Sequence, residues 1–330
     1  MTRPSLLFRA VLVALLLYAA PAAAGAADKP VPVVISQAFQ SMLYLPFYVA
    51  IDQGFFAQQG VEVDKETAGS PPSALSAVIS GSADFSIHGP EWTAIAASKG
   101  AKVDIVANLV NGAAVWIAAT PDFAPSFAHD GVASLKGQRV VTGAMPTTST
   151  SLFMKLAKEG GLDAKADVDM VPVQIGSEPG PFLAGQAKVA VMYEPGLEQA
   201  VSRGMKVVFG FPKAYGAYAF SSLSARADVD PDKTQRVVNA LELAIRFMHA
   251  DRPATLAVAR KEFPSLDPAV VEAAVTRMLA ENVYPASVQT SPEALTTAMQ
   301  TQIALGNLAA QPDYAQFVVQ TYVQKALQLP

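Results

Sequence analysis

The first third of the chain alternates short apolar runs with amphipathic stretches, and this alternation limits the folds open to it. An apolar run at residues 31–38 is typical of a buried strand, and the helix after it begins near Pro46 and ends at Gly60. The next helix repeats the pattern, with Ser70 as its cap and Gly81 as its end. Because strands separated by helices pair mainly in parallel, with the helices on the faces of the sheet, the sequence predicts an α/β fold.

The same plan returns after an irregular stretch and predicts a second lobe. Residues 118–218 are expected to form this lobe, and residues 27–117 together with 219–330 the first lobe. The chain then crosses between the lobes twice, within residues 108–120 and within residues 211–222. Since two crossings can act together as a hinge, we expect ligand to close the lobes.

Beyond residue 224 the sequence predicts only helices. Three of them begin with a capping side chain followed by proline, at Asp230-Pro231, Asp267-Pro268 and Ser291-Pro292. Their apolar positions recur at helical spacing, which favours packing onto the first lobe. A separate helical domain is the alternative.

Residues 1–26 have the features of a secretory signal peptide. Arg3 and Arg9 precede an apolar run of eleven residues, 10–20, which is too short to span a bilayer, and Ala24 and Ala26 fit a small-residue cleavage pattern. The mature protein is therefore expected to be free in the periplasm.

Charge and cysteine content exclude several classes of function. Without the two arginines of the signal peptide, 24 − 2 = 22 basic residues face 28 acidic ones, a formal charge of 22 − 28 = −6. This balance disfavours nucleic acid and anionic membranes as partners. The chain has no cysteine, which excludes disulfides, thiolate metal sites and a cysteine nucleophile. His129 and His249 have no partner at metal-ligand spacing, so no metal or other cofactor is expected.

The ligand site is expected around residues 81–92, where a short apolar strand breaks at Gly89-Pro90 and restarts as a helix. In open α/β sheets, ligands collect beyond the carboxyl ends of strands, near helix N-termini. Loops that end at the same edge supply the other candidates. The candidate ligand-binding residues are Gln37, Phe39, Tyr44, Ser70, His88, Glu91, Trp92, Asn111, Thr147, Thr148, Ser149, Glu178, Tyr193 and Glu194.

Several candidates have a purely structural alternative. Trp92 can stack on a planar ligand or fill the core. Glu91 and Glu194 can pair with a ligand nitrogen or simply interact with a helix dipole. The hydroxyl residues at 147–151 can hold an anion or cap a helix. His88 can bind ligand or be a loop histidine bonded to solvent.

Four sequence blocks resemble the periplasmic substrate-binding proteins of ABC importers, in the branch that serves nitrate, sulfonates, taurine and thiamine-pyrimidine precursors. The resemblance spans residue 31 to about residue 285. It implies a type II two-lobe periplasmic binding protein fold, in which each lobe has a mixed, mostly parallel sheet flanked by helices, with extra C-terminal helices. It also implies that a small molecule is delivered to an inner-membrane permease with its ATPase. The protein is expected to be a monomer. The blocks are LPFYVAIDQGFF at 45–56 running on to QGVEV at 59–63, residues 74–85 ending in GSADF, SLKGQRV at 134–140, and VMYEP at 191–195.

The predicted cleft loops contain Glu91, Glu178 and Glu194 but neither lysine nor arginine. A bare oxyanion would meet like charge there, so a nitrogen heterocycle such as a thiamine-pyrimidine precursor ranks first as ligand. An alkanesulfonate, taurine or another small organic anion is the second candidate, held by the hydroxyls at 147–151. Pyrimidine synthases that share this fold are enzymes, but they rely on a cysteine-rich stretch that this chain lacks, so enzyme function is only a minor alternative. A sensing module of a receptor would need a membrane-spanning segment after residue 26, and the sequence has no such apolar run.

Overall fold

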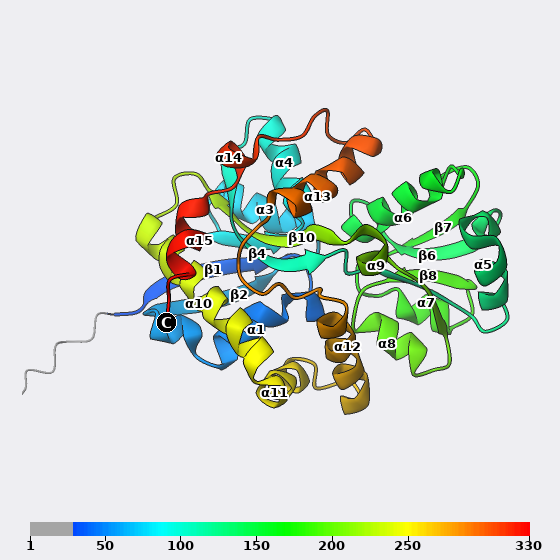
Figure 1. Ribbon diagram of the computed structural model, residues 1–330, viewed down its shortest axis with the longest axis horizontal. Helices are drawn as coiled ribbons and strands as arrows, with labels where there is room; N and C mark the ends of the chain where they lie inside the picture. The colour runs from blue at the N-terminus through cyan, green and yellow to red at the C-terminus, as the bar shows by residue number, and fades with distance from the viewer. Residues whose placement is uncertain (1–28) are drawn as a thin grey trace, which may run out of the picture.

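The computed structural model describes residues 29–330 and forms two lobes, each built around a five-stranded sheet (Figure 1). The predicted signal peptide, residues 1–26, lies outside the described residues. Within residues 29–330, no helix combines the length and apolarity needed to cross a membrane. The predicted α/β class with two lobes and additional C-terminal helices is confirmed.

The sheet of lobe 1 has the strand order β2-β1-β3-β10-β4. Strand β1 pairs in parallel with both β2 and β3, whereas β10 is antiparallel to β3 and β4, so the sheet is mixed. Its elements before the first crossing are β1 (Val31–Gln37), η1 (Met42–Tyr44), α1 (Leu45–Asp52), α2 (Phe55–Gln58), β2 (Val61–Thr67), α3 (Pro71–Ser80), β3 (Phe85–His88), α4 (Pro90–Ser98) and β4 (Val103–Gly112).

The sheet of lobe 2 has the order β7-β6-β8-β5-β9. Strand β6 is parallel to β7 and β8, and β5 is antiparallel to β8 and β9. Its elements are β5 (Trp116–Ala119), α5 (Ala124–Asp130), η2 (Gly131–Leu135), β6 (Arg139–Gly143), α6 (Thr148–Glu159), β7 (Asp169–Val173), α7 (Pro179–Leu183), β8 (Val189–Met192), α8 (Gly196–Val201) and β9 (Lys206–Gly210).

The crossings between the sheets are shorter than the sequence predicts. Only residues 113–115 separate β4 from β5, and the return runs through α9 (Phe211–Tyr215) into β10 (Ala217–Arg226). Residues 217–222, predicted as part of a connecting segment, are therefore strand. The strand is nearly all buried, so it lacks the alternation of polar and apolar residues that marks a half-exposed strand, and its three serines interrupt the apolar run. The lobe boundaries at 117/118 and 218/219 stay a prediction.

The C-terminal segment consists of helices, as predicted, and all three predicted caps are present. Asp230, Asp267 and Ser291 each accept a hydrogen bond from a backbone N–H in the first turn of the helix they precede. Asp251 caps a further helix that the sequence analysis did not predict, since the proline there stands one position later. The helices are α10 (Pro231–Ala250), α11 (Arg252–Glu262), α12 (Pro268–Ala280), α13 (Pro292–Ala304), α14 (Tyr314–Phe317) and α15 (Gln320–Ala326).

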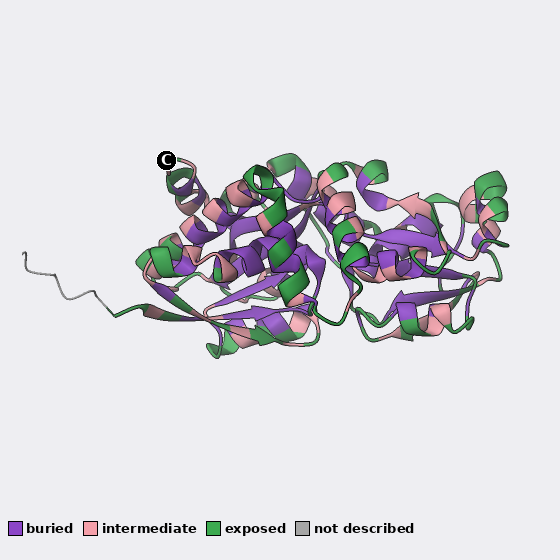
Figure 2. Cartoon of the chain, turned by 90° about the horizontal axis from the view of Figure 1, so that it is seen from below, coloured by how far each residue is buried: buried purple, intermediate pink, exposed green. Residues whose placement is uncertain are grey.

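These helices pack mainly on lobe 1 but also reach lobe 2. Helix α10 contacts α1, α2 and α15, and α13 lies against β10 and α4. Helix α12 contacts α8, and α13 contacts α6, so two C-terminal helices bridge the lobes (Figure 1). Burial is concentrated in both sheets and along the junction between them (Figure 2). The lobes are therefore joined by packed helices as well as by the two crossings.

Candidate functional site

Three aromatic side chains, contributed by both lobes, pack against one another at the candidate site. Phe39 follows β1, Tyr44 ends η1, and both belong to lobe 1. The ring of Phe39 lies 5.7 Å from that of Tyr44, edge to face, and 5.2 Å from that of Tyr193, which follows β8 in lobe 2. All three are buried, so the junction is an apolar, aromatic environment in which polar groups are poorly solvated.

Glu91 enters this environment from the first turn of α4. Its side chain has no exposed surface, and its Oε1 accepts a hydrogen bond of 2.5 Å from Oγ1 of Thr148 in lobe 2. Its Oε2 has no hydrogen-bond partner among the described residues. Burial raises the pKa of Glu91 to about 7, despite the opposing effect of the bond from Thr148. The carboxyl group is therefore held between the lobes with one oxygen unsatisfied.

Glu178 provides a second buried carboxyl group, from lobe 2. It lies just before α7, is 1% exposed, and its Oε1 lacks any partner within residues 29–330. Burial raises its pKa to about 7. A Cβ placed on Gly143 would lie 3.3 Å from Oε1 of Glu178 and 3.1 Å from Oγ1 of Thr147, so this carboxyl group lies against the start of α6. The site thus has one unsatisfied carboxyl oxygen from each lobe.

The hydroxyl-rich start of α6 is already engaged by the protein itself. Thr147 caps the helix by accepting from the backbone N–H of Thr150, and Thr148 donates to Glu91. The backbone N–H of Ser149 donates to the hydroxyl of Tyr193 at 2.9 Å. Burial raises the pKa of Tyr193, so this phenol stays protonated and able to donate in turn. All of these groups are buried, and the helix start faces the junction rather than solvent.

Four of the predicted residues have clear structural roles or lie outside this buried group. Gln37 accepts from Tyr48 and donates to Thr67, and Ser70 caps α3. Asn111 is half-buried at the end of β4, where its backbone N–H donates to the carbonyl of Val283. His88 is fully buried rather than bonded to solvent.

The ring of His88 is held by its own neighbours. Its Nδ1 lies 2.9 Å from the carbonyl oxygen of Gly89, and its Nε2 lies 2.9 Å from Oγ of Ser86. Since a carbonyl only accepts, Nδ1 carries the proton and Nε2 accepts from Ser86. Burial lowers the pKa of His88 to about 4, so the ring is neutral near pH 7. These contacts support a structural role.

Both carboxyl oxygens of Glu194 already accept hydrogen bonds from the protein itself. It has no exposed surface, and its Oε1 accepts from Nε of Arg277 on α12 at 3.1 Å while its Oε2 accepts from the backbone N–H of Glu198. Burial, followed by the charge of Glu198, raises its pKa to about 8. The carboxyl group of Glu194 thus has an internal partner, and its pairing with a ligand nitrogen stays a prediction. That partner is a cation 83 positions away in the sequence, outside every loop expected at the cleft.

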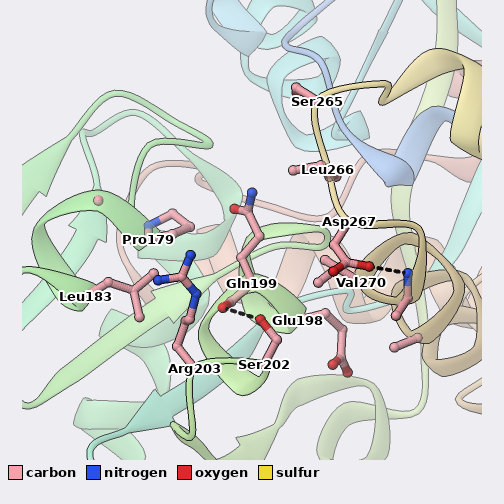
Figure 3. A pocket seen from close by; sticks show the side chains of 13 residues that line it. Pro179, Leu183, Glu198, Gln199, Ser202, Arg203, Ser265, Leu266, Asp267 and Val270 are labelled. Carbon is pink, nitrogen blue, oxygen red and sulfur yellow. Dashed lines mark hydrogen bonds between the residues drawn. The ribbon is translucent and has the colours of Figure 1, made fainter.

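A pocket of about 160 Å³ reaches the site from outside. It adjoins a larger surface groove of about 620 Å³ between α7 and α8 of lobe 2 and the segment around α12, with Gln199, Ser265 and Leu266 lining both (Figure 3). The groove therefore marks an approach from between the lobes to Phe39, Tyr193 and Glu178, whereas Glu91 lies behind them and does not line either pocket. The smaller pocket is lined by Phe39, Gln40, Ser41, Gly176, Glu178, Tyr193, Glu194, Pro195, Gly196, Gln199, Phe263, Ser265 and Leu266.

A family model described as NMT1/THI5 like matches residues 42–254, about two thirds of the chain. The chain belongs to the NMT1/THI5-like family. The matched region contains all four sequence blocks in full, and it extends from η1 into α11. The family resemblance inferred from those blocks is thus confirmed.

Relatives of this NMT1/THI5-like chain are distant in sequence. YtlA of Bacillus subtilis (strain 168) is 23% identical over 264 residues, which cover 76% of this chain and 77% of that protein. The alkanesulfonate-binding protein SsuA from Xanthomonas axonopodis pv. citri, bound to MOPS, superposes with a TM-score of 0.69 at 20% identity, covering 91% of this chain and 99% of that one. The nitrate-binding protein NrtA from Synechocystis PCC 6803 has a TM-score of 0.72 at 13% identity, with coverage of 91% and 89%. These likenesses confirm the type II two-lobe fold.

Trp92 lies in a small apolar cluster of lobe 1, packed with Leu75, Val78 and Val103. This position favours the core interpretation over stacking on a ligand. We expect Trp92→Ala to lower the free energy of unfolding by about 3–5 kcal/mol, because it leaves a large cavity, while ligand affinity changes little. Denaturant unfolding together with calorimetry of binding tests this. A loss of affinity with unchanged stability would restore the stacking role.

The segment between α11 and α12 is the part of the site surroundings that sequence reasoning missed. Phe263, Ser265 and Leu266 line the approach, and Arg277 binds Glu194. Only the cap at Asp267 marks this turn in the sequence, and a cap gives no information on which lobe the helix will meet.

Proposed function

We propose that this NMT1/THI5-like protein is the ligand-capturing component of an ABC importer, and that its ligand is a nitrogen heterocycle bearing N–H donors, such as a thiamine-pyrimidine precursor. The observation that carries the choice of ligand is the pair of buried carboxyl groups, Glu91 and Glu178, each with an oxygen that lacks a partner in the described part of the chain. Buried acceptors without partners are costly, and a ligand that donates to both would remove that cost.

The surroundings of the two carboxyl groups fit such a ligand. Hydrogen bonds to a charged group contribute about 1.5–3 kcal/mol each, so two of them supply much of a micromolar affinity. The rings of Phe39 and Tyr193 meet at 5.2 Å beside Glu178 on the approach, where they can contact a planar ring. With pKa values raised to about 7, each carboxyl group can accept from an amine or share a proton with a ring nitrogen near neutral pH.

An alkanesulfonate or taurine is the second candidate, favoured by the buried hydroxyls and backbone N–H groups at the start of α6. A sulfonate placed there meets Glu91, and two like charges about 4 Å apart repel by about 4 kcal/mol at an effective dielectric near 20. Taurine carries an ammonium group that could pair with a glutamate. An enzyme acting on its ligand is the minor alternative.

The remaining parts of the proposal concern delivery. The signal peptide at residues 1–26 would place the mature protein in the periplasm, and lobe closure around the short crossings would present a docking surface to the permease. The likeness to SsuA and NrtA supports this arrangement at the level of the fold.

Native mass spectrometry of freshly purified protein, followed by calorimetry, tests the choice of ligand. We expect a co-purifying ligand or tight binding of hydroxymethylpyrimidine, weak binding of taurine and an alkanesulfonate, and no response to nitrate. Each ligand should be recovered unchanged, and turnover would establish an enzyme instead. Tight binding of nitrate or a sulfonate with no response to any heterocycle or amine would contradict the proposal.

A further inference from the structure

The carboxyl group of Glu91 lies between the N-terminal ends of two helices that belong to different lobes. It belongs to the first turn of α4, and it folds back so far that a Cβ on Gly89 would lie 2.2 Å from Oε2. Only glycine at position 89 leaves this space free. On the other side, Oε1 accepts from Thr148, the first residue of α6.

Two helix starts facing one point make a favourable place for an anion. The backbone N–H groups in the first turn of a helix and the positive end of its dipole both attract negative charge. Helices α4 and α6 have nine and twelve residues, and the first turn of α6 adds buried hydroxyls. In this structure the group at that point is the protein's own carboxylate, fully buried and with Oε2 unpartnered among residues 29–330.

We infer that Glu91 determines the charge of the ligand by occupying the anion position at the start of α6. While the Glu91 side chain occupies this position, an oxyanion has neither space nor a compensating charge there. The unpartnered Oε2 can instead accept a hydrogen bond from a donor on the ligand. Glu178 does not have the same role, because no hydroxyl of α6 donates to it. The inference deepens the proposed function in one respect only: it explains why the site would reject anions.

Replacing Glu91 tests this with methanesulfonate and inorganic sulfate as the probes, measured by calorimetry at constant ionic strength. We expect Glu91→Ala to bind methanesulfonate at least about tenfold more tightly than the unaltered protein, because a like charge at contact distance is removed and its space is opened. Adding Thr148→Val to this variant should reduce the gain, since the hydroxyl that held Glu91, and would then donate to the anion, is absent. Glu62→Ala, at an exposed position on β2, is the matched control and should gain nothing.

Glu91→Ser serves as a second variant if alanine impairs folding, because serine is well tolerated at helix starts. A thermal melt of each variant confirms that it is folded. Folded Glu91→Ala and Glu91→Ser proteins that bind neither probe more tightly would overturn the inference, as would a gain that Thr148→Val leaves undiminished. None of these measurements uses a heterocycle, so a wrong choice of ligand in the proposed function would leave this result unchanged.

Discussion

Replacing Arg277 with methionine is expected to lower the free energy of unfolding by about 3–5 kcal/mol at pH 9, the usual cost of removing one partner of a buried ion pair. The guanidinium of Arg277 lies 3.1 Å from Oε1 of Glu194 and also donates to Glu198. The side chains of these glutamates are 0% and 9% exposed, so water can replace the lost cation only poorly. Methionine retains most of the apolar volume and removes only the charge and the donors.

The loss should shrink as the pH falls. The pKa of Glu194 is raised to about 8, first by burial and then by the charge of Glu198, and it rises further without Arg277. Below that pKa the carboxyl group takes up a proton and no longer needs a cation. We therefore expect the difference between the variant and the unaltered protein to be clearly smaller at pH 6 than at pH 9.

Urea unfolding at several pH values measures this effect, and Arg260→Met is the matched control. Arg260 pairs with Glu272 at 3.0 Å, but these side chains are 46% and 52% exposed, so the control should cost at most about 1 kcal/mol at any pH. Because Arg277 joins α12 to lobe 2, small-angle scattering should also detect a more open Arg277→Met protein. Equal losses in the two variants would show that the buried pair has no special role.

The arrangement of strands and caps was largely readable from the sequence because those signals are local. Asp230, Asp267 and Ser291 each mark a helix start through one side chain and the proline that follows it. Strand β10 was missed because burial on both faces removes the alternation that identifies a strand. Strand β10 inserts between β3 and β4 only after the chain has passed through lobe 2. The spacing of apolar residues in the sequence carries no information about such a long-range pairing.

The sequence predicted which loops would gather around Glu91, but not which side chains would pair with one another there. Glu91 was predicted to lie among the loops at the ends of neighbouring strands, and the fold brings it close to Thr148 and Tyr193. That these residues bind a ligand stays a prediction. Long-range contacts decide which carboxyl group has a hydrogen-bond or ion-pair partner and which has none. Glu194 meets Arg277 from a distant helix, whereas no cation pairs with Glu178 in the described chain. Two glutamates with similar local sequence contexts therefore have different roles.

Glu178→Gln is expected to stabilise the ligand-free protein at pH 8, by about 1–3 kcal/mol. In the folded state burial raises the pKa of Glu178 to about 7, from an unfolded value near 4.3–4.5. Between these values the folded protein holds a proton that the unfolded chain releases, so stability falls as the pH rises towards 7 and the penalty is complete above it. Glutamine has no such proton to lose. Urea unfolding from pH 5 to pH 8 measures the difference between the two proteins, which should widen with pH.

Glu62→Gln, at an exposed position on β2, is the control and should leave the pH dependence unchanged.

The same Glu178→Gln change should weaken binding of an amine-bearing ligand by about tenfold or more, because it removes a charged acceptor from the site. Opposite effects on stability and on binding are the mark of a side chain kept for ligand at the expense of the fold. A Glu178→Gln protein that is less stable at pH 8 would mean that the carboxylate already has a partner of its own, and the argument for a donor-bearing ligand would then rest on Glu91 alone.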